Sequence, residues 1–467
     1  MPEGTAESTE DRAPGAGTLC RDPDDVGGIA PNPRARVARG YSEPVDARER
    51  VLAEVDAAED ELVELTRALV RIPTVNPPGA HYADCAELLA NRLRAMDMSV
   101  QLLTAEDHPD HNAKHPRVNV LGRLEGQSPR PCLHLNGHID VVPAGTGWSV
   151  DPFAGVVQDR KIFGRGSADM KAGIAAAVVA VQALLRAGVR LQGSVEISGS
   201  VDEESGGFAG MEWLCKQGYL GAERTDYVII PEPLNVDRVC VGHRGVYWFE
   251  VHAAGKVAHG SMPFLGASAI EHLATFLERV RTELTPRLQS RETAMPVVPD
   301  AARHASINVN SIVGGQAGQF PQSACVAEAA SAILDRRFLH EEDFDAVKAE
   351  IAALLEKLSG EDPRRRYRLE DLMVVHPVLA PEDSPLVASL STDISALSGR
   401  APRLVASPGT YDHKHVARVA GVPHCVAYGP GILDLAHQVD EYCAIDDLMQ
   451  ATKVIALSVM RLCGVAA

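Results

Sequence analysis

The sequence predicts an α/β protein with a mixed sheet, into which a smaller α+β domain of the ferredoxin-like type is inserted. Between residues 46 and 240, apolar strand-like segments alternate with helix-like segments, which is typical of a sheet covered by helices. Between residues 241 and 360 the strand-like segments alternate apolar with polar residues, as strands with one exposed face do. The α/β character returns over residues 361–467. A chain of 467 residues is long enough for two domains.

The N-terminal part begins with a segment that has no regular pattern. Residues 1–45 are rich in Gly, Pro and charged residues and show no apolar periodicity, so we expect a disordered tail. From residue 56 leucines recur at helical spacing, and Pro73 ends the expected helix. A second helix follows the loop 73–79. Strand-like segments then lie at 99–103, 117–124 and 131–142.

The longest apolar run of the chain, residues 172–185, is flanked by Lys171 and Arg186. It is shorter than the ~18 residues that a membrane span needs, so we expect a buried helix. Two further buried strands are expected at 194–201 and 227–230.

The inserted domain has its own order of elements. Alternating strands are expected at 245–253, 304–313 and 326–338, with helices at 267–284 and 341–358. This order of strands and helices is that of a ferredoxin-like fold. Beyond the insertion we expect a strand at 422–428 and a C-terminal helix from Asp446.

Composition excludes some partners. A net charge of −18 would repel phosphate backbones and anionic lipids, so we expect neither a nucleic acid nor a membrane as partner. The nine cysteines are scattered and form no CxxC pair, which favours reduced thiols in a cytoplasm over disulfides. The N-terminus shows no basic-then-apolar signal pattern.

Five side chains with metal-binding chemistry stand out in the sequence. The carboxyl ends of strands are where ligands bind in open α/β sheets, and several of these residues follow expected strands. Two imidazoles and three carboxylates suit Zn²⁺ and tolerate Mn²⁺ or Co²⁺. One shared carboxylate can bridge two ions ~3.5–4 Å apart. The five residues are His138, Asp169, Glu204, Glu232 and His437.

Several motifs in a fixed order identify a family. They include Arg71-Ile72-Pro73, the stretch from His134 to Pro143, Phe163-Gly164-Arg165-Gly166 and Asp202-Glu203-Glu204. With these motifs the chain resembles the dinuclear-zinc family of acetylornithine deacetylase, succinyl-diaminopimelate desuccinylase, aminoacylase and the glutamate-releasing carboxypeptidases. The resemblance extends from Arg71 to the C-terminal helix. A match of several motifs in the right order is far more specific than one short pattern.

The resemblance implies a role for each candidate ligand. Asp169 would bridge two zinc ions, with Co²⁺ or Mn²⁺ as possible substitutes. His138 and Glu232 would bind one ion, and Glu204 and His437 would bind the other. Residues 46–240 and 361–467 would form the catalytic metal-binding domain, and 241–360 a lid and dimerisation domain.

Two carboxylates beside the ligands would act without binding a metal. Asp140 would orient the imidazole of His138. Adjacent residues at a strand end point in different directions, so Glu204 can face a metal while Glu203 faces water. We therefore expect Glu203 to be the general base. By the same resemblance, His259 would reach into the partner subunit of a homodimer to stabilise the oxyanion.

Three residues are candidates for contact with the substrate. Arg337 resembles the family's clamp for a substrate carboxylate, a role that suits a bidentate guanidinium. Gln319 stands where the family usually has Asn. Lys414 lies in a loop that departs from the family's commoner Gly-Gly-Thr-Asp type.

We expect a cytoplasmic, homodimeric amidohydrolase that deacylates an N-acyl amino acid, such as a deacetylase or desuccinylase. A dipeptidase or carboxypeptidase of the same family is the first alternative. The alternative of another class is a non-catalytic protein that keeps the fold and binds a small ligand or an assembly partner.

Overall fold

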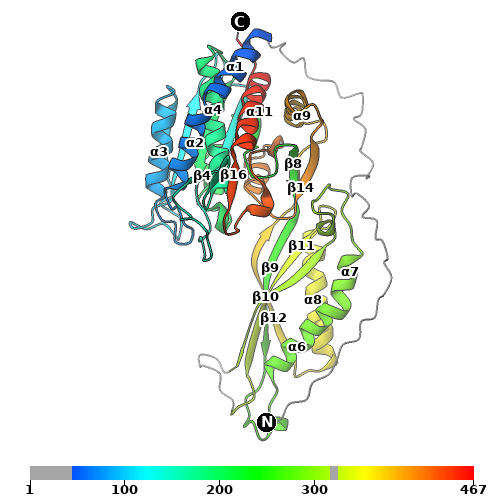
Figure 1. Ribbon diagram of the computed structural model, residues 1–467. Helices are drawn as coiled ribbons and strands as arrows, with labels where there is room; N and C mark the ends of the chain where they lie inside the picture. Colours follow the sequence, from blue (N-terminus) through cyan, green and yellow to red (C-terminus); the bar gives the residue numbers. More distant parts are fainter. Residues whose placement is uncertain (1–44, 316–323, 467) are drawn as a thin grey trace, which may run out of the picture. The chain divides into compact units, whose positions relative to one another are not determined.

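The structure is a computed structural model, which describes residues 45–315 and 324–466 (Figure 1). Its larger sheet has nine strands, and the order along it is β1-β2-β6-β3-β7-β15-β8-β13, with β14 pairing with β8. The central strands β6, β3, β7 and β15 are parallel, while β1 and β2 are antiparallel to their neighbours. The strands are β1 (Ser99–Thr104), β2 (Val118–Leu124), β3 (Cys132–His138), β6 (Ser194–Ser200), β7 (Tyr227–Ile230), β8 (Arg238–His243), β13 (Val378–Leu379), β14 (Arg403–Ser407) and β15 (Cys425–Ala427).

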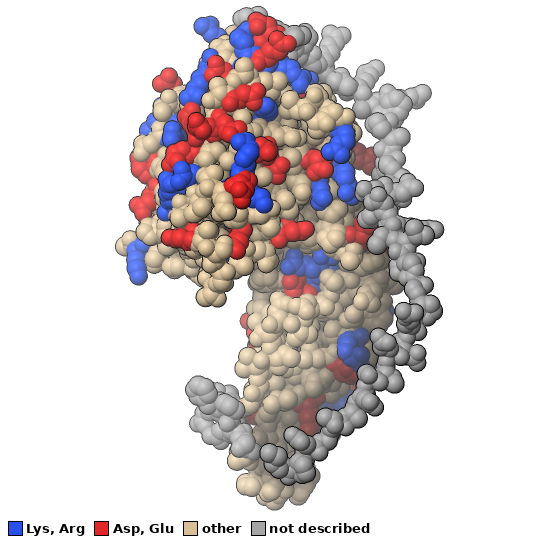
Figure 2. Space-filling view, in the orientation of Figure 1, with Lys and Arg blue, Asp and Glu red and all other residues tan. Residues whose placement is uncertain are grey.

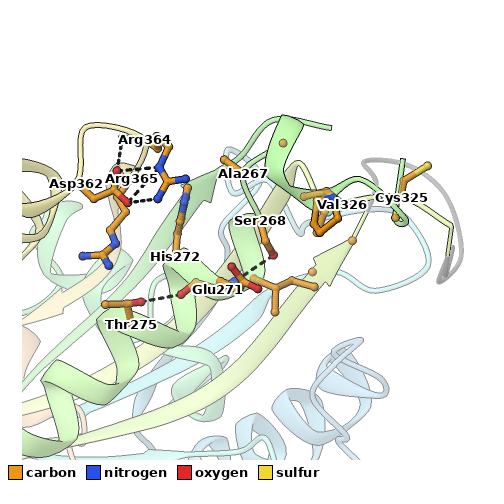
Figure 3. A pocket seen from close by; sticks show the side chains of 17 residues that line it. Ala267, Ser268, Glu271, His272, Thr275, Cys325, Val326, Asp362, Arg364 and Arg365 are labelled. Carbon is orange, nitrogen blue, oxygen red and sulfur yellow. Dashed lines mark hydrogen bonds and ion pairs between the residues drawn. The ribbon is translucent and has the colours of Figure 1, made fainter. Parts of the chain in front are cut away.

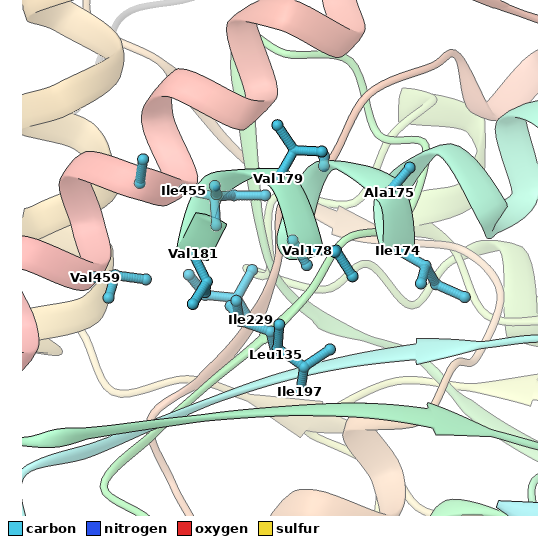
Figure 4. Close-up of a cluster of buried hydrophobic side chains, with 14 of the residues drawn as sticks. Leu135, Ile174, Ala175, Val178, Val179, Val181, Ile197, Ile229, Ile455 and Val459 are labelled. Atoms are coloured by element: carbon cyan, nitrogen blue, oxygen red, sulfur yellow. The ribbon is translucent and has the colours of Figure 1, made fainter. Parts of the chain in front are cut away.

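One face of the central strands packs on helices α4 (Ala172–Arg186) and α11 (Ile445–Cys463). Figure 4 shows side chains of the two helices meeting apolar side chains of β3, β6 and β7. Branched residues dominate the contact because they pack well on a pleated surface. The buried residues include Leu135, Ile174, Val178, Val181, Ile197, Ile229, Ile455 and Val459.

The remaining helices of this part lie early and late in the chain. They are α1 (Val45–Ala57), α2 (Glu59–Val70), α3 (Tyr82–Arg94), α5 (Met211–Lys216), α9 (Pro385–Ser398) and α10 (His413–Arg418). Helix α1 begins before residue 56, where we expected the first helix to start. Its earlier part was not expected because only a few apolar residues, such as Val51 and Val55, lie on its buried side. A small sheet of β4 (Val156–Gln158), β5 (Lys161–Phe163) and β16 (Tyr442–Ala444) completes this part.

A second, antiparallel sheet has the order β10-β11-β9-β12. Its strands are β9 (Gly245–Ala254), β10 (Ser306–Gly315), β11 (Ala329–Phe338) and β12 (Arg366–Val375). Helices α6 (Ala269–Arg279) and α8 (Phe344–Glu361) pack on it around a separate apolar core. Strand β12 follows the expected boundary at residue 360, so the sheet is larger than the sequence suggested. All but one of the residues of β12 are exposed or partly exposed, which weakens the alternation that identifies a strand.

Two short connections, each between consecutive strands, link the two sheets. Strand β8 ends at His243 and β9 begins at Gly245, while β12 ends at Val375 and β13 begins at Val378. Gly245 lies at one of these connections, where there is no room for a side chain because a Cβ would lie 2.4 Å from the ring of Phe338. The expected fold class, a mixed α/β sheet with an inserted α+β unit, is confirmed.

One helix of the described chain, Ser167–Arg186, is long and apolar enough to cross a membrane by length and composition alone, and 83% of its most apolar stretch is buried inside the protein. Its apolar side chains are those that cover the sheet, as a core helix requires.

Candidate active site

Three neighbouring strands deliver polar side chains to the same edge of the larger sheet. His138 is the last residue of β3, Glu204 lies in a short 3₁₀ turn after β6, and Glu232 follows β7 by two residues. These strands are parallel, so their carboxyl ends meet at one edge. Asp169 comes from the segment before α4, and His437 from the loop before β16.

The structure brings the five expected ligands together in two groups that share Asp169. In the first, His138 Nε2 lies 3.0 Å from Asp169 Oδ1 and 3.9 Å from Glu232 Oε1. In the second, His437 Nε2 lies 3.4 Å from Asp169 Oδ2 and 3.0 Å from Glu204 Oε2. Within each group the candidate ligand atoms lie within 4.8 Å of one another. The two oxygens of Asp169 thus face different groups, as a bridging carboxylate requires.

The electrostatics of the groups favour a bound cation. Burial raises the pKa of Glu204 to about 7 and that of Glu232 well above its usual value. Hydrogen bonds to Asp169 and Glu204 raise the pKa of His437 to about 10. Burial opposes the charge on His138, but the hydrogen bond to Asp169 still raises its pKa. Crowded carboxylates here hold protons on both imidazoles, and divalent cations would replace those protons.

Asp140 orients its neighbours in a different way from the one we expected. His138 Nδ1 donates to the backbone oxygen of Asp140 at 3.0 Å, while the carboxylate lies 3.6 Å away. That carboxylate instead accepts the backbone N–H groups of Glu203 and Glu204, both at 3.1 Å. Asn76 donates a third hydrogen bond to it. A buried carboxylate that receives three donors fixes the turn in which Glu203 and Glu204 lie.

Glu441 supports Asp169, which sequence reasoning missed. One of its oxygens accepts the N–H groups of Ala168 and Asp169 at 2.9 and 3.1 Å, and the other pairs with buried Arg165. The only sequence signal was an acidic residue shortly after His437. Its actual partners lie more than 270 positions earlier in the chain.

The other candidates have different surroundings. Glu203 Oε1 accepts from Nζ of Lys414 at 3.2 Å, so Lys414 contacts the expected base. His259 lies on an exposed loop, where its ring is hydrogen-bonded to Ser261. One edge of the Arg337 guanidinium, formed by Nε and Nη2, is paired with Asp335 of the same strand, at 2.8 and 2.9 Å. Gln319 lies outside the described residues.

A cavity of about 690 Å³ lies in the inserted unit, and none of the five candidate ligands lines it (Figure 3). It is lined by the first turns of α6 and by the segment after α8, with Cys325 and Val326 nearby. Its Arg364 is paired with Asp362, and its Arg365 with Glu361. Because both arginines are already paired, this cavity offers less chemistry than the edge of the larger sheet.

Comparisons with known proteins give the family. The model of peptidase family M20/M25/M40 matches residues 134–461. A succinyl-diaminopimelate desuccinylase of Gluconacetobacter diazotrophicus is 29% identical over 420 residues, which cover 86% of this chain and 96% of the relative. An N-formyl-4-amino-5-aminomethyl-2-methylpyrimidine deformylase of Bacillus subtilis is 27% identical, with coverage of 88% and 96%.

Solved structures support the same fold. The dipeptidase Dug1p of Saccharomyces cerevisiae matches with a TM-score of 0.72 and 15% identity, over 90% of this chain and 99% of that one. Human carnosine dipeptidase 1 matches with a TM-score of 0.70 and 18% identity, over 90% and 100%. The family match covers well over half of the chain, so this protein belongs to peptidase family M20/M25/M40 and is a hydrolase of amide bonds.

Proposed function

We propose that the protein removes the acyl group from an N-acyl amino acid, with Glu203 as general base in a site that holds two Zn²⁺ ions. The observation that carries this proposal is the pair of ligand groups that share Asp169. His138 and Glu232 would hold one ion, and Glu204 and His437 the other. Family membership and a complete ligand set speak against a binding protein without activity.

Two metal ions, when bound, lower the pKa of a water molecule to about 7 and polarise the amide carbonyl. Side chains of the protein transfer the protons and hold the base in position. Glu203 accepts the proton of the attacking water and passes it to the leaving nitrogen. Asp140 holds the turn that carries Glu203, because its carboxylate accepts the backbone N–H of Glu203. No covalent bond between the substrate and a side chain is needed.

The substrate class rests on the relatives. Several matching proteins are named succinyl-diaminopimelate desuccinylase, and one of Methylobacterium is 30% identical over 82% of this chain. These names favour a deacylase over the dipeptidases and carboxypeptidase among the structural matches, which share less than 25% identity and therefore support the fold alone. Arg337 remains our candidate for the substrate carboxylate, provided that it exchanges Asp335 for the substrate.

A homodimer would complete the site. His259 is exposed on its loop, together with Phe264, whose surface is 78% accessible. Ile312 and Val313 on β10 are 60% and 67% exposed. Figure 2 shows mostly uncharged surface over the visible face of the inserted unit, in contrast to the mixed charges over the larger part. These features support a protein interface through which His259 reaches the partner's site.

A location in the cytoplasm remains our proposal. The eight cysteines of the described part are free thiols, and all except Cys325 are buried. Reduced thiols are typical of that compartment.

The test is metal analysis of the purified protein, combined with hydrolysis assays. The panel contains N-succinyl-diaminopimelate and N-acetyl, N-formyl and N-succinyl amino acids, together with dipeptides, with and without added Zn²⁺, Mn²⁺ or Co²⁺. We expect about two ions per subunit and turnover of one acyl class that returns when metal is restored. Turnover of dipeptides alone would favour the alternative, and a protein that binds no metal under any loading would contradict the proposal.

A further inference from the structure

A line of buried polar side chains leads along β3 and β6 to the site. Alternate residues of a strand share a face, so His134 and Asn136 lie on the face that also bears His138. In the parallel register His134 lies beside Glu196, and Asn136 beside Ser198. All of these side chains are buried. Buried polar groups need hydrogen-bond partners, and here these side chains are hydrogen-bonded to one another.

The hydrogen bonds form one continuous chain. Asn136 Nδ2 donates to Asp412 Oδ2 at 2.9 Å, and Ser198 Oγ donates to Asn136 Oδ1 at 2.7 Å. His134 Nε2 lies 2.7 Å from Ser198 Oγ. The other nitrogen of the ring, Nδ1, lies 2.9 Å from Glu196 Oε2. The chain therefore has a carboxylate at each end, Glu196 and Asp412.

Glu196 is ionised at its end of the chain. Arg123 donates to Glu196 Oε1 at 2.8 Å, and Arg224 also contacts this oxygen. Although burial opposes the charge, the hydrogen bond to His134 and the arginines lower the pKa of Glu196 to about 2. A carboxylate in this state can only accept hydrogen bonds.

Ser198 is the link in the middle of the chain. Its hydroxyl donates to the amide oxygen of Asn136, whose amide nitrogen donates to Asp412. Both nitrogens of the His134 ring are engaged, Nε2 with Ser198 and Nδ1 with Glu196. Loss of the Ser198 hydroxyl would therefore separate His134 and Glu196 from Asn136 and Asp412.

The far end of the chain holds helix α10 against the turn that carries the base. Asp412 immediately precedes α10, and its Oδ1 lies 2.6 Å from where a Cβ on Gly207 would be. His415 Nε2 is hydrogen-bonded to the backbone oxygen of Gly206 at 2.7 Å. Lys414 lies between these two contacts, and its Nζ donates to Glu203. The side chains of Lys414 and Glu203 are only 6% and 11% exposed.

We propose that Lys414 is a positioning residue for Glu203, and that the hydrogen-bond chain from Glu196 to Asp412 holds Lys414 in place. The inference rests on the proposed role of Glu203 as base. A glutamate side chain has several rotatable bonds, and a general base works only within hydrogen-bond reach of its proton. An ammonium group that holds one carboxylate oxygen leaves the other oxygen to face the water.

The first test replaces Lys414 in the intact, metal-loaded protein. With N-succinyl-diaminopimelate and the N-acetyl and N-formyl amino acids as probes, we expect Lys414→Met to lower kcat about 10- to 100-fold, with KM and metal content unchanged. Lys414→Arg should restore part of kcat. Lys216→Met, an exposed lysine of the neighbouring helix α5, is the control and should match the wild type. A raised KM with unchanged kcat would make Lys414 a substrate ligand and overturn the proposal.

The second test addresses the hydrogen-bond chain from Glu196 to Asp412. Ser198→Ala breaks it in the middle, whereas Ser194→Ala removes an equally buried hydroxyl of the same strand that bonds to Glu125 and Ser128 outside the chain. We expect only Ser198→Ala to lower kcat, by about 3- to 10-fold. Equal kcat in the two serine variants would contradict the proposed role of this hydrogen-bond chain.

Glu203→Gln, measured in the same assays, separates this inference from the proposed function. If Glu203→Gln is inactive while Lys414→Met behaves like the wild type, only the inference fails. If Glu203→Gln keeps near-normal turnover with its metals bound, the proposed mechanism fails and the inference fails with it.

Discussion

Glu203 and Glu204 are adjacent in sequence, yet the structure gives them different partners. Glu204 lies 3.0 Å from the imidazole of His437, whereas Glu203 is paired with Lys414. The 3₁₀ turn after β6 causes the difference, because neighbouring side chains of a turn leave it in different directions. One carboxylate can therefore bind metal while the other remains free to move a proton.

This division of roles gives the first prediction. Glu203→Gln keeps the size of the side chain but removes its ability to accept a proton. We expect kcat to fall by about 10²- to 10⁴-fold while two metal ions remain bound. Turnover and metal content are measured on the same preparation, with Glu64→Gln as the control, since Glu64 is paired with arginines on the outside of α2.

Buried histidines of α10 link stability to pH. Burial lowers the pKa of both His413 and His415 to about 3. In the unfolded chain a histidine takes up its proton near pH 6.5. Between pH 6.5 and 3 the unfolded state therefore binds more protons than the folded state at these positions. Stability from this source is complete above pH 6.5 and is lost as the pH falls, by about 1.4 kcal/mol per pH unit for each ring.

We therefore expect His413→Gln to unfold with a shallower pH dependence than the wild type. Denaturant midpoints of metal-free protein between pH 7 and 5 measure the slope, and metal-free protein removes the contribution of metal binding. His81→Gln serves as the control because His81 is exposed and paired with Asp84. A slope equal to that of the wild type would show that His413 is not buried in neutral form.

At the level of single residues, the sequence was most informative where a motif places a side chain directly at a strand end. His138, Glu204 and Glu232 follow strands that could be recognised from their apolar residues, and the structure brings them together. The partner of Lys414 could not be foreseen, because Glu203 lies 211 positions away and the contact depends on how α10 packs. The same reason explains why the role of Glu441 was missed.

Among the elements, helix α4 has a direct connection to the site. Its second residue, Gly173, packs against the backbone of Pro231, the neighbour of Glu232. A Cβ on Gly173 would lie 2.0 Å from the oxygen of Pro231. Since Gly173 lies within a helix and the atom it faces belongs to the backbone, a larger side chain must displace one of the two segments.

We predict that Gly173→Ala moves the segment of Glu232 and weakens the ion held by His138. The variant should lose about 1–3 kcal/mol of stability and bind close to one metal ion per subunit instead of two. Gly360→Ala is the matched control, because Gly360 also lies in a helix but has open space around it. That control should gain up to about 1 kcal/mol from helix propensity and keep both ions.

Element boundaries were predicted best where an apolar or alternating pattern is unbroken. Strands β6 and β9 were expected within one residue of their observed positions, whereas β3 ends four residues before the expected end at residue 142. Strand β12 was not expected. All but one of its residues are exposed or partly exposed, and it is a strand chiefly because β9 offers it a partner along its whole length. Pairing of this kind depends on long-range contacts that a local pattern does not contain.

At the scale of the whole molecule, we propose that a second subunit completes the site with His259. The five candidate ligands and Glu203 lie together, but no contact between His259 and these residues occurs in the described part of the chain. Its loop also exposes Met262, Phe264 and Leu265, which are 42%, 78% and 53% accessible. Exposed apolar residues around a catalytic candidate are what an interface with a second subunit would cover.

Mixing two inactive variants tests this arrangement. His259→Ala lacks the oxyanion donor and Glu203→Gln lacks the base, so each homodimer should be nearly inactive. In a mixed dimer, the subunit with an intact Glu203 receives His259 from its partner. Random exchange makes about half of the dimers mixed, with one complete site in each, so about a quarter of wild-type activity should return. If mixed dimers form, as shown by mass spectrometry, and activity stays at the level of the separate variants, His259 does not act across the interface.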